Sequence, residues 1–243
     1  RHSTITSQFD DMMTVKIDFP KEKCNQPRTG FSFNRFAIPK LAGYKGRAVY
    51  VDADMLVFRD FRDMWDTPFD GAQVLYAPSS DPKRVKQFSV LLLNCDELRW
   101  EPKEIVRGLD ENQYDYDGLM KEFCIVPPDK VRATLPTDWN SLEEYHPGKT
   151  GLTHYTDMHL QPWVSRHNPI GYSWVNYLVD AVNEGFITQA ELRDALQKGF
   201  IRPSLAWQIK LPRRTWKQFN RTFAKILDRS FAPHRTLAER LAS

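Results

Sequence analysis

The sequence has few cysteines, no long hydrophobic run and no internal repeat, and each absence narrows the class of protein. Its three cysteines, Cys24, Cys95 and Cys124, are widely spaced, and no C-x-x-C pair occurs. This pattern argues against a disulfide scaffold and a zinc site, and is typical of a reducing compartment. No apolar stretch reaches the roughly 20 residues of a membrane-spanning helix. Even so, a hydrophobic content of 41% in 243 residues is enough for a sizeable core.

The net charge of +3 conceals an uneven distribution along the chain. Residues 212–243 hold eight Lys or Arg and only two Asp or Glu, so the rest of the chain is mildly acidic. An acidic body in which no base-reading module is visible argues against nucleic acid as a partner.

Apolar stretches rich in branched and aromatic residues predict strands, and helical patterns lie between and after them. The predicted strands are 15–19, 48–51, 73–76, 88–93 and 152–155. The predicted helices are 33–41, 60–65, 102–108, 117–123, 173–184, 188–198 and 215–231, and residues 127–151 are predicted to form a long loop. Thr188 and Glu191 form a capping box at one helix start. Alternating strands and helices, with strands apolar on both faces, predict an α/β sheet covered by helices on both sides.

Two carboxylates interrupt an apolar run in AVYVDADMLVFRD, residues 48–60, where Asp52 and Asp54 follow the predicted strand 48–51. Burying ionised carboxylates without a positive partner is very unfavourable, so a positive charge is expected there. Because the chain can turn at the strand end, both carboxylates can converge on one hard cation. The ordinary alternative is that Asp is common in turns, and a second D-x-D at Asp115–Asp117 lies in a polar stretch.

Arg35, His154 and His159 are further candidates for a binding site. Arg35 lies in an apolar helical segment, where a guanidinium needs an anionic partner. That partner is either a carboxylate of the chain or a phosphate or sugar hydroxyl of a ligand. His154 lies in the predicted strand 152–155 and His159 follows it, and both are candidate nitrogen ligands. Histidines in such places are more often hydrogen-bonded structural residues.

The segments FSFNRFAIPKLAGYK and AVYVDADMLVFRDFRDMW, the later SVLLLNC and the HY…PW element resemble a family 8 glycosyltransferase over residues 29–163. That family includes glycogenin and bacterial lipopolysaccharide sugar transferases. The resemblance implies a GT-A fold, which is a Rossmann-like mixed sheet flanked by helices. It also implies metal-dependent transfer of a sugar, with retention at the anomeric carbon, from a nucleotide-sugar (a UDP-sugar) to a saccharide or lipid-linked acceptor.

The resemblance assigns roles to individual residues. Asp52, Asp54 and His154 match the family's metal ligands, with Ala53 between the two carboxylates, and Arg35 matches an arginine that contacts the donor. Mixed carboxylate and imidazole ligands favour Mn²⁺ over Mg²⁺.

Other positions depart from the family's pattern. The acceptor-side motif D-Q-D-x-L-N aligns with residues 115–120, so Tyr116, beside Asp115, replaces a Gln near the anomeric carbon. In the HY…KPW element Gln161 replaces a pyrophosphate-facing Lys, a loss for which His159, Arg166 or Arg35 can compensate. We expect Asp115, Tyr116 and Gln161 to be the catalytic positions. The departures keep two alternatives open: a nucleotide-sugar hydrolase, and a transfer-inactive GT-A-like membrane-associated binding module.

Residues 212–243 predict a basic amphipathic tail on a GT-A-like domain of residues 1–211. Apolar side chains recur at near-helical spacing with Lys and Arg opposite: Trp216, Phe219, Phe223, Ile226 and Phe231. Such a helix binds an anionic membrane surface or packs its apolar stripe against protein. We expect a cytoplasmic protein, peripheral at the inner face of a membrane. The family's first strand–helix unit would precede Arg1, so the domain is expected to be incomplete at its N-terminus.

Overall fold

The computed structural model describes residues 2–6, 13–81, 83–84, 86 and 88–233. The described chain forms two compact units. The first contains the described residues up to Ser141 together with Pro147–Leu152, and the second contains Leu142–His146 and the described residues from Thr153 on. The boundary predicted at residue 212 falls inside the second unit, and residues 234–243 of the predicted tail lie outside the described part.

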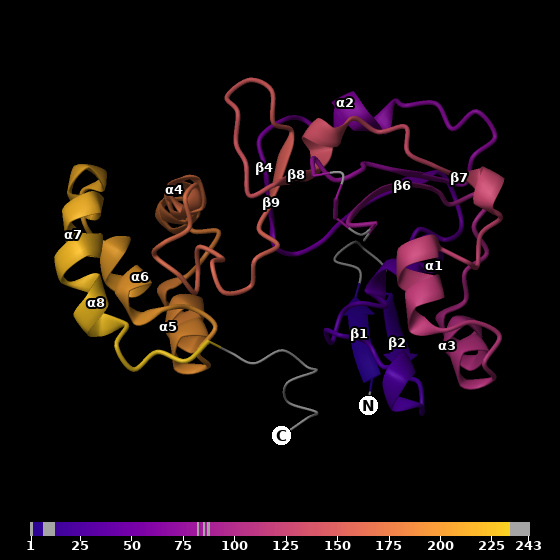
Figure 1. The fold of residues 1–243 in the computed structure, drawn as a ribbon, viewed down its shortest axis with the longest axis horizontal. Coiled ribbons are helices and arrows are strands. Elements are labelled where there is room, and N and C mark those ends of the chain that lie inside the picture. The colour runs from indigo at the N-terminus through magenta and orange to yellow at the C-terminus, as the bar shows by residue number, and fades with distance from the viewer. Residues whose placement is uncertain (1, 7–12, 82, 85, 87, 234–243) are drawn as a thin grey trace. The chain divides into compact units, whose positions relative to one another are not determined.

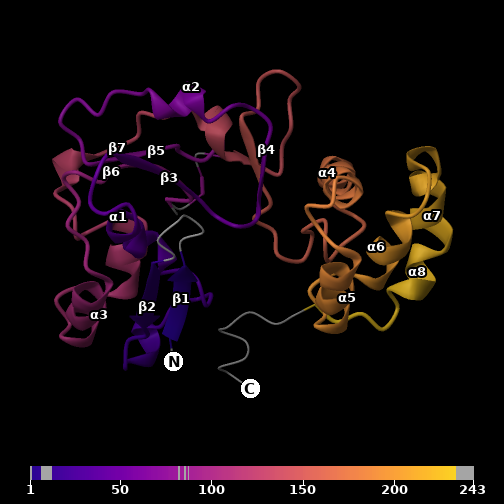
Figure 2. The ribbon, with the colours of Figure 1, turned by 180° about the vertical axis from the view of Figure 1, so that it is seen from behind.

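The first unit is built on a mixed sheet with the strand order β3-β6-β5-β7. Figure 1 labels β6 and β7 of this sheet, and Figure 2 labels all four strands. β6 (Val90–Asn94) pairs antiparallel with β3 (Arg47–Val51) and with β5 (Val74–Tyr76), and β7 (Val131–Arg132) pairs parallel with β5. The sequence predicted the first three strands. β7 lies in the predicted loop 127–151, and that prediction is wrong here because a two-residue strand has no periodicity to detect.

Helices cover both faces of this sheet, which confirms the predicted α/β class. Leu91 and Leu93 join a buried cluster with residues of α3 (Pro102–Asp110), while Val90 and Leu92 join another with Met64 of α2 (Arg62–Trp65). Alternate residues of β6 reach different clusters because successive side chains of a strand point to opposite faces. Figure 2 shows α2 on one side of the sheet and α3 on the other.

Smaller elements complete the first unit. β1 (His2–Thr6) pairs antiparallel with β2 (Thr14–Asp18); the sequence predicted β2 but not β1. The predicted helix 33–41 is a 3₁₀ turn, η2 (Asn34–Ala37), followed by α1 (Ile38–Leu41), and the predicted helix 117–123 is the π-helical segment η3 (Gly118–Glu122). Further 3₁₀ turns are η1 (Lys23–Asn25), η4 (Pro128–Lys130) and η5 (Thr137–Asn140).

A three-stranded sheet has the order β4-β9-β8. Its strands are β4 (Met55–Val57), β9 (Leu152–His154) and β8 (Ser141–Leu142). The sequence predicted β9, whereas β4 was not predicted and β8 lies in the predicted loop. β4 begins directly after Asp54 and β9 ends at His154, so two ends of neighbouring strands carry candidate ligands.

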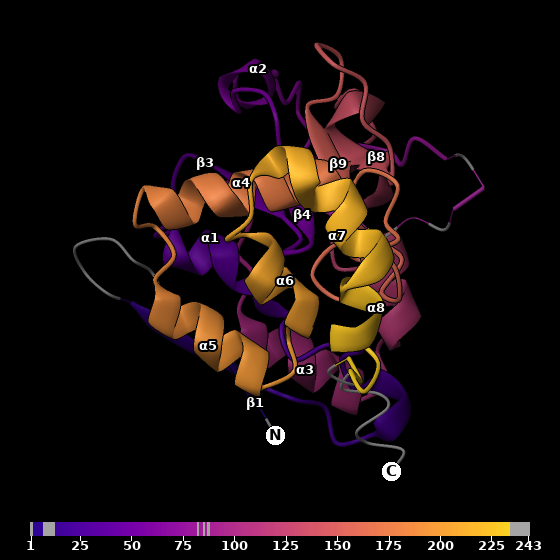
Figure 3. The ribbon, with the colours of Figure 1, turned by 90° about the vertical axis from the view of Figure 1, so that its left-hand side faces the viewer.

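The helical part of the second unit, which is labelled in Figure 3, has a buried core of its own. Its helices are α4 (Gly171–Asn183), α5 (Gln189–Gln197), α6 (Pro203–Gln208), η6 (Arg213–Thr215), α7 (Trp216–Thr222) and α8 (Ala224–Leu227). The buried core includes Val175, Leu178, Leu192 and Leu205. α5 starts with the capping box predicted at Thr188 and Glu191. The predicted helix 215–231 is divided at Phe223 into α7 and α8.

The apolar residues of the tail are buried at one position and exposed at others. Trp216 is buried in the helical core, whereas 60% of the surface of Phe223 and 71% of that of Ile226 are exposed. Part of the stripe therefore packs on the protein itself, which is one of the two interpretations left open by the sequence. Among the described residues, no helix combines the length and apolarity needed to cross a bilayer.

Candidate metal centre

The carboxylate pair lies where the chain leaves β3. All five residues of β3 are half-buried, because β3 is an edge strand of its sheet. The backbone N–H of Asp52 donates to the carbonyl of Ser89 at 3.0 Å, which extends the β3–β6 pairing by one residue. Ala53, which is exposed, and Asp54 then form a turn into β4. This turn, rather than an extended strand, brings the two carboxylates together.

Arg35 and Tyr50 hold one oxygen of Asp52. The Arg35 side chain is 5% exposed, and its Nη2 lies 3.2 Å from Oδ1 of Asp52. The Tyr50 hydroxyl donates to the same oxygen, and the Arg35 guanidinium lies 4.7 Å from the centre of the Tyr50 ring. Burial raises the pKa of Tyr50, so its hydroxyl keeps the proton it donates. The sequence allowed either a carboxylate of the chain or a ligand group as the anionic partner of Arg35. In the structure that partner is the carboxylate of Asp52.

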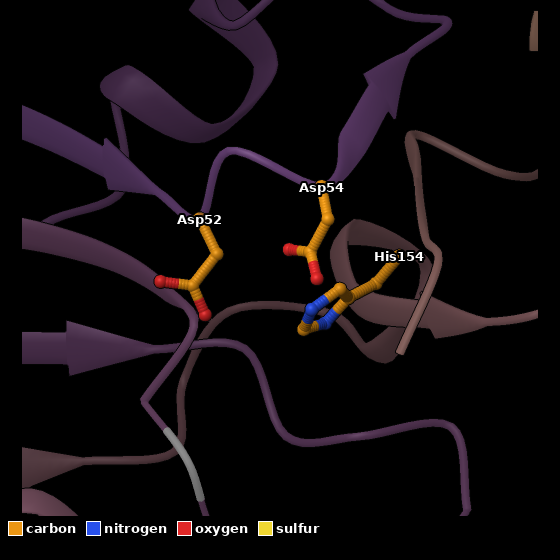
Figure 4. A group of neighbouring side chains, drawn as sticks. All are labelled: Asp52, Asp54 and His154. Atoms are coloured by element: carbon orange, nitrogen blue, oxygen red, sulfur yellow. The ribbon is translucent and has the colours of Figure 1, made fainter. Parts of the chain in front are cut away.

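His154 completes a group of three ligand residues. One ligand atom from each of Asp52, Asp54 and His154 lies within 4.8 Å of the others. Figure 4 shows the three side chains directed into a common space. His154 is 3% exposed, and Oδ2 of Asp52 accepts no hydrogen bond within the described chain. Two carboxylates and an imidazole match the donor set that a divalent cation such as Mn²⁺ or Mg²⁺ can use.

A strained backbone position supports this arrangement. Phe88 has a φ of 50°, in the left-handed region that a bulky aromatic residue rarely adopts. Its carbonyl accepts a hydrogen bond from Nη1 of Arg35 at 3.0 Å, while the next carbonyl, that of Ser89, holds the backbone of Asp52. The unusual turn before β6 therefore supplies both carbonyl contacts.

The predicted positions Asp115 and Tyr116 make structural contacts. Oδ1 of Asp115 accepts from the backbone N–H of Gly118 at 2.7 Å, at the start of η3. Tyr116 is buried, its N–H donates to Asn25, and its ring lies 5.5 Å from the Arg28 guanidinium. Their catalytic role stays a prediction.

Gln161 and His159 are also held by local contacts. Gln161 is buried, and its Nε2 donates to the carbonyl of Tyr155 at 2.9 Å. His159 is exposed, and its backbone N–H donates to Asp157 at 3.0 Å. Neither belongs to the three-residue ligand group, and their contacts to a donor stay predictions.

Sequence reasoning missed Tyr50 and Phe88. Tyr50 precedes Asp52 by two residues, so both side chains leave the same face of an extended chain, and this spacing could have identified it. The conformation of Phe88 has no comparable signal, because the turn it belongs to contacts residues 35 and 52, which are distant in sequence.

Part of the N-terminal half of the chain matches a known family model. The sequence model described as glycosyl transferase family 8 matches residues 3–116. "Protein CDI" of Arabidopsis thaliana is 25% identical in an alignment of 141 positions that covers 52% of this chain and 52% of that protein. The match therefore spans about half of this curated relative.

Two solved structures are similar to the chain. A structure of the galactosyltransferase LgtC in complex with donor and acceptor sugar analogs has a TM-score of 0.42 at 14% identity, over 60% of this chain and 65% of that one. The glycosyltransferase GlyE of Streptococcus pneumoniae has a TM-score of 0.43 at 17% identity, over 63% of this chain and 46% of that one.

The match to the model of glycosyl transferase family 8 covers residues 3–116, slightly less than half of the chain, and agrees with the resemblance seen in the sequence. This segment contains Arg35, Asp52 and Asp54, and it ends before His154. The third ligand is therefore placed by the structure rather than by the family match.

Proposed function

We propose that the chain is a metal-dependent retaining glycosyltransferase of GT-A type that moves a sugar from a nucleotide-sugar, a UDP-sugar, to a saccharide or lipid-linked acceptor. The observation that carries the proposal is the convergence of Asp52, Asp54 and His154. It occurs in a chain whose residues 3–116 match a glycosyltransferase family. A metal-binding D-x-D at a strand end is the feature that the proposed activity requires.

The donor set fits the implied metal, because the three ligand atoms are close together and one oxygen of Asp52 has no other partner in the described chain. Asp52, Asp54 and His154 would hold the ion, and the mixed oxygen and nitrogen set favours Mn²⁺ over Mg²⁺. A divalent ion bound there supplies Lewis-acid stabilisation of the negative charge on a departing nucleoside diphosphate. Arg35 and Tyr50 orient Asp52 for this task. In the same proposal Asp115, Tyr116 and Gln161 serve the reacting sugar and His159 the donor.

Product analysis tests this function against its rivals. The chain is incubated with Mn²⁺ and a panel of UDP-sugars, with and without saccharide acceptors. Formation of a new glycoside only when an acceptor is present would identify sugar transfer. Release of free sugar that no acceptor diverts would instead identify a nucleotide-sugar hydrolase. Liposome binding without metal-dependent donor binding in calorimetry would identify the transfer-inactive, membrane-associated binding module.

The hydroxyl of Tyr50 is expected to strengthen metal binding without touching the metal. Tyr50→Phe removes the donor that fixes Oδ1 of Asp52 and leaves the ring under Arg35. Loss of such an orienting contact typically weakens metal binding ~10-fold or more. Calorimetric titration with Mn²⁺ measures the change. Tyr44→Phe, which removes a hydroxyl bonded to the carbonyl of Trp100, is the matched control; an equal loss in both variants would contradict the orienting role.

We further propose that the chain works at the inner, cytoplasmic face of a membrane, with Phe223 and Ile226 at the surface. Both are exposed on a basic segment. Replacing both by Ser should abolish co-sedimentation with vesicles that contain phosphatidylglycerol, because the apolar part of the contact is lost. Phe186→Ser is the control, since Phe186 is 79% exposed in the same unit but lies away from the basic segment in sequence. Unchanged sedimentation of the double variant would exclude this surface.

A further inference from the structure

A cationic cavity lies within the helical part of the second unit, among residues that the glycosyltransferase proposal does not use. It has a volume of about 300 Å³, within the range of small-molecule sites. The loop 162–169, α4, α6, η6 and α7 contribute its walls. Four of the lining residues are cations: Arg166, Arg202, Arg213 and Lys217. Figure 3 shows the helices that carry most of these walls.

The carboxylates of the unit neutralise only part of this charge. Asp180 pairs with Arg213 at the surface. Asp228 lies 3.9 Å from Arg166, but its two oxygens already accept hydrogen bonds from the backbone and hydroxyl of Ser204 at 2.8 and 2.6 Å. Two carboxylates therefore face four cations, and two positive charges remain without a counter-ion in the described chain.

Several donors of the cavity also lack acceptors. The Arg166 side chain is 18% exposed, yet it donates no hydrogen bond within the described chain. Arg202 is 2% exposed and uses three donors on Pro162, Ser204 and Gln208, so two of its five N–H groups have no acceptor there. Lys217 is exposed and makes no ion pair with a described residue. A ligand that supplies charged oxygens would gain charge-assisted hydrogen bonds from these donors.

Two more features of the cavity indicate the chemistry of a ligand that would fit it. Oδ1 of Asn220, another lining residue, is buried and accepts no hydrogen bond from the described chain, so it is suited to a hydroxyl donor. Tyr172 and Trp216 add aromatic surface to the cavity wall. A phosphate monoester carries a charge of about −1.5 to −2 at neutral pH, which matches the two unbalanced cations. Its three terminal oxygens can also accept from guanidinium groups on different sides, whereas one arginine satisfies a carboxylate.

We propose that this cavity binds a phosphate monoester carried by a hydroxyl-bearing molecule, through Arg166, Arg202, Lys217 and Asn220. The group comes from a small phosphorylated polyol or from a phospholipid head group. This site is separate from the proposed sugar-transfer chemistry and does not depend on it, because its residues take no part in the metal centre.

Binding of two probes to the full chain tests the proposal. Glycerol 3-phosphate is titrated by calorimetry, and vesicles of phosphatidylcholine with and without phosphatidic acid are tested by co-sedimentation. Lys217→Ala and Arg166→Gln should each weaken binding about tenfold, since each removes a charged hydrogen bond to the phosphate. Arg214→Ala should leave it unchanged, because Arg214 is an equally charged neighbour that does not line the cavity. Lys217 is exposed and makes no side-chain hydrogen bond or ion pair with a described residue, so its substitution should leave the fold intact, and an unchanged unfolding temperature checks this.

Each outcome decides the proposal. Binding of glycerol 3-phosphate that both cavity substitutions weaken supports the site with a soluble source. Binding confined to phosphatidic acid vesicles, with the same sensitivity, supports the site with a lipid source. Absence of binding to both probes, or binding that survives Lys217→Ala and Arg166→Gln equally well, overturns it.

Discussion

Replacing Asp54 by Asn is expected to abolish Mn²⁺-dependent binding of UDP to this chain. The substitution keeps the size of the side chain but removes one of the two charged ligands of the three-residue group. An amide is a weaker and uncharged ligand, and Asp52 shares its charge with Arg35. Loss of an orienting contact alone weakens metal sites by ~10–100-fold, so loss of a ligand should weaken this one by at least ~100-fold.

Calorimetric titration of UDP in the presence of Mn²⁺ measures this effect, and titration of Mn²⁺ alone separates metal binding from donor binding. Asp66→Asn is the matched control, because Asp66 is exposed at the end of α2 and outside the ligand group. Both variants should unfold at the same temperature as the parent chain. Unchanged UDP affinity in Asp54→Asn, with Mn²⁺ present, would remove the basis for the metal assignment and for the proposed reaction.

The sequence predicted the parts of the fold that carry strong periodic signals. β3, β5 and β6 are runs of branched and aromatic residues, and their alternation between two buried clusters explains why both faces are apolar. The capping box at Thr188 located the start of α5 because its two hydrogen bonds join residues three apart in sequence. Signals of this kind are local, so they can be read without knowledge of the tertiary structure.

The parts that the sequence did not reveal depend on long-range pairing. β7 and β8 are two residues long and exist only because a partner strand lies beside them. The broken helix 215–231 has a continuous apolar pattern, but the fold buries Trp216 and leaves Phe223 exposed. The cationic cavity likewise combines residues 166, 202 and 217, whose separation along the chain hides their relation.

The candidate metal site was only partly predictable for the same reason. Asp52 and Asp54 are two residues apart, and the apolar sequence around them was a sufficient local signal. Arg35 was expected to face an anion, but the sequence did not show which one. Its partner, Asp52, is 17 residues away along the chain, so the pairing depends on the fold. His154 was one of two candidate nitrogen ligands by its position, and only the family resemblance grouped it with the carboxylates. Its distance from them is a property of the folded chain.

Asp228→Asn is expected to destabilise the second unit strongly, by ~3 kcal/mol, because it removes the negative charge nearest to two largely buried arginines. Asp228 is 11% exposed in its side chain, binds Ser204 of α6 through both oxygens, and lies 3.9 Å from Arg166. Burial lowers the pKa of Arg202 to about 10, while the charge of Asp228 opposes this shift, so Arg202 stays cationic at neutral pH and needs that carboxylate.

Denaturant unfolding followed by tryptophan fluorescence measures the loss, because Trp216 and its neighbours report on this unit. Asp194→Asn is the matched control: Asp194 forms an exposed pair with Lys198 one helical turn away, and such pairs contribute less than ~1 kcal/mol. A clearly larger loss of unfolding free energy in Asp228→Asn than in Asp194→Asn would establish that Asp228 anchors the segment after residue 212 to the folded unit. Equal, small effects would instead show that the basic tail is attached only loosely, and that its contact with Ser204 contributes little to the stability of the unit.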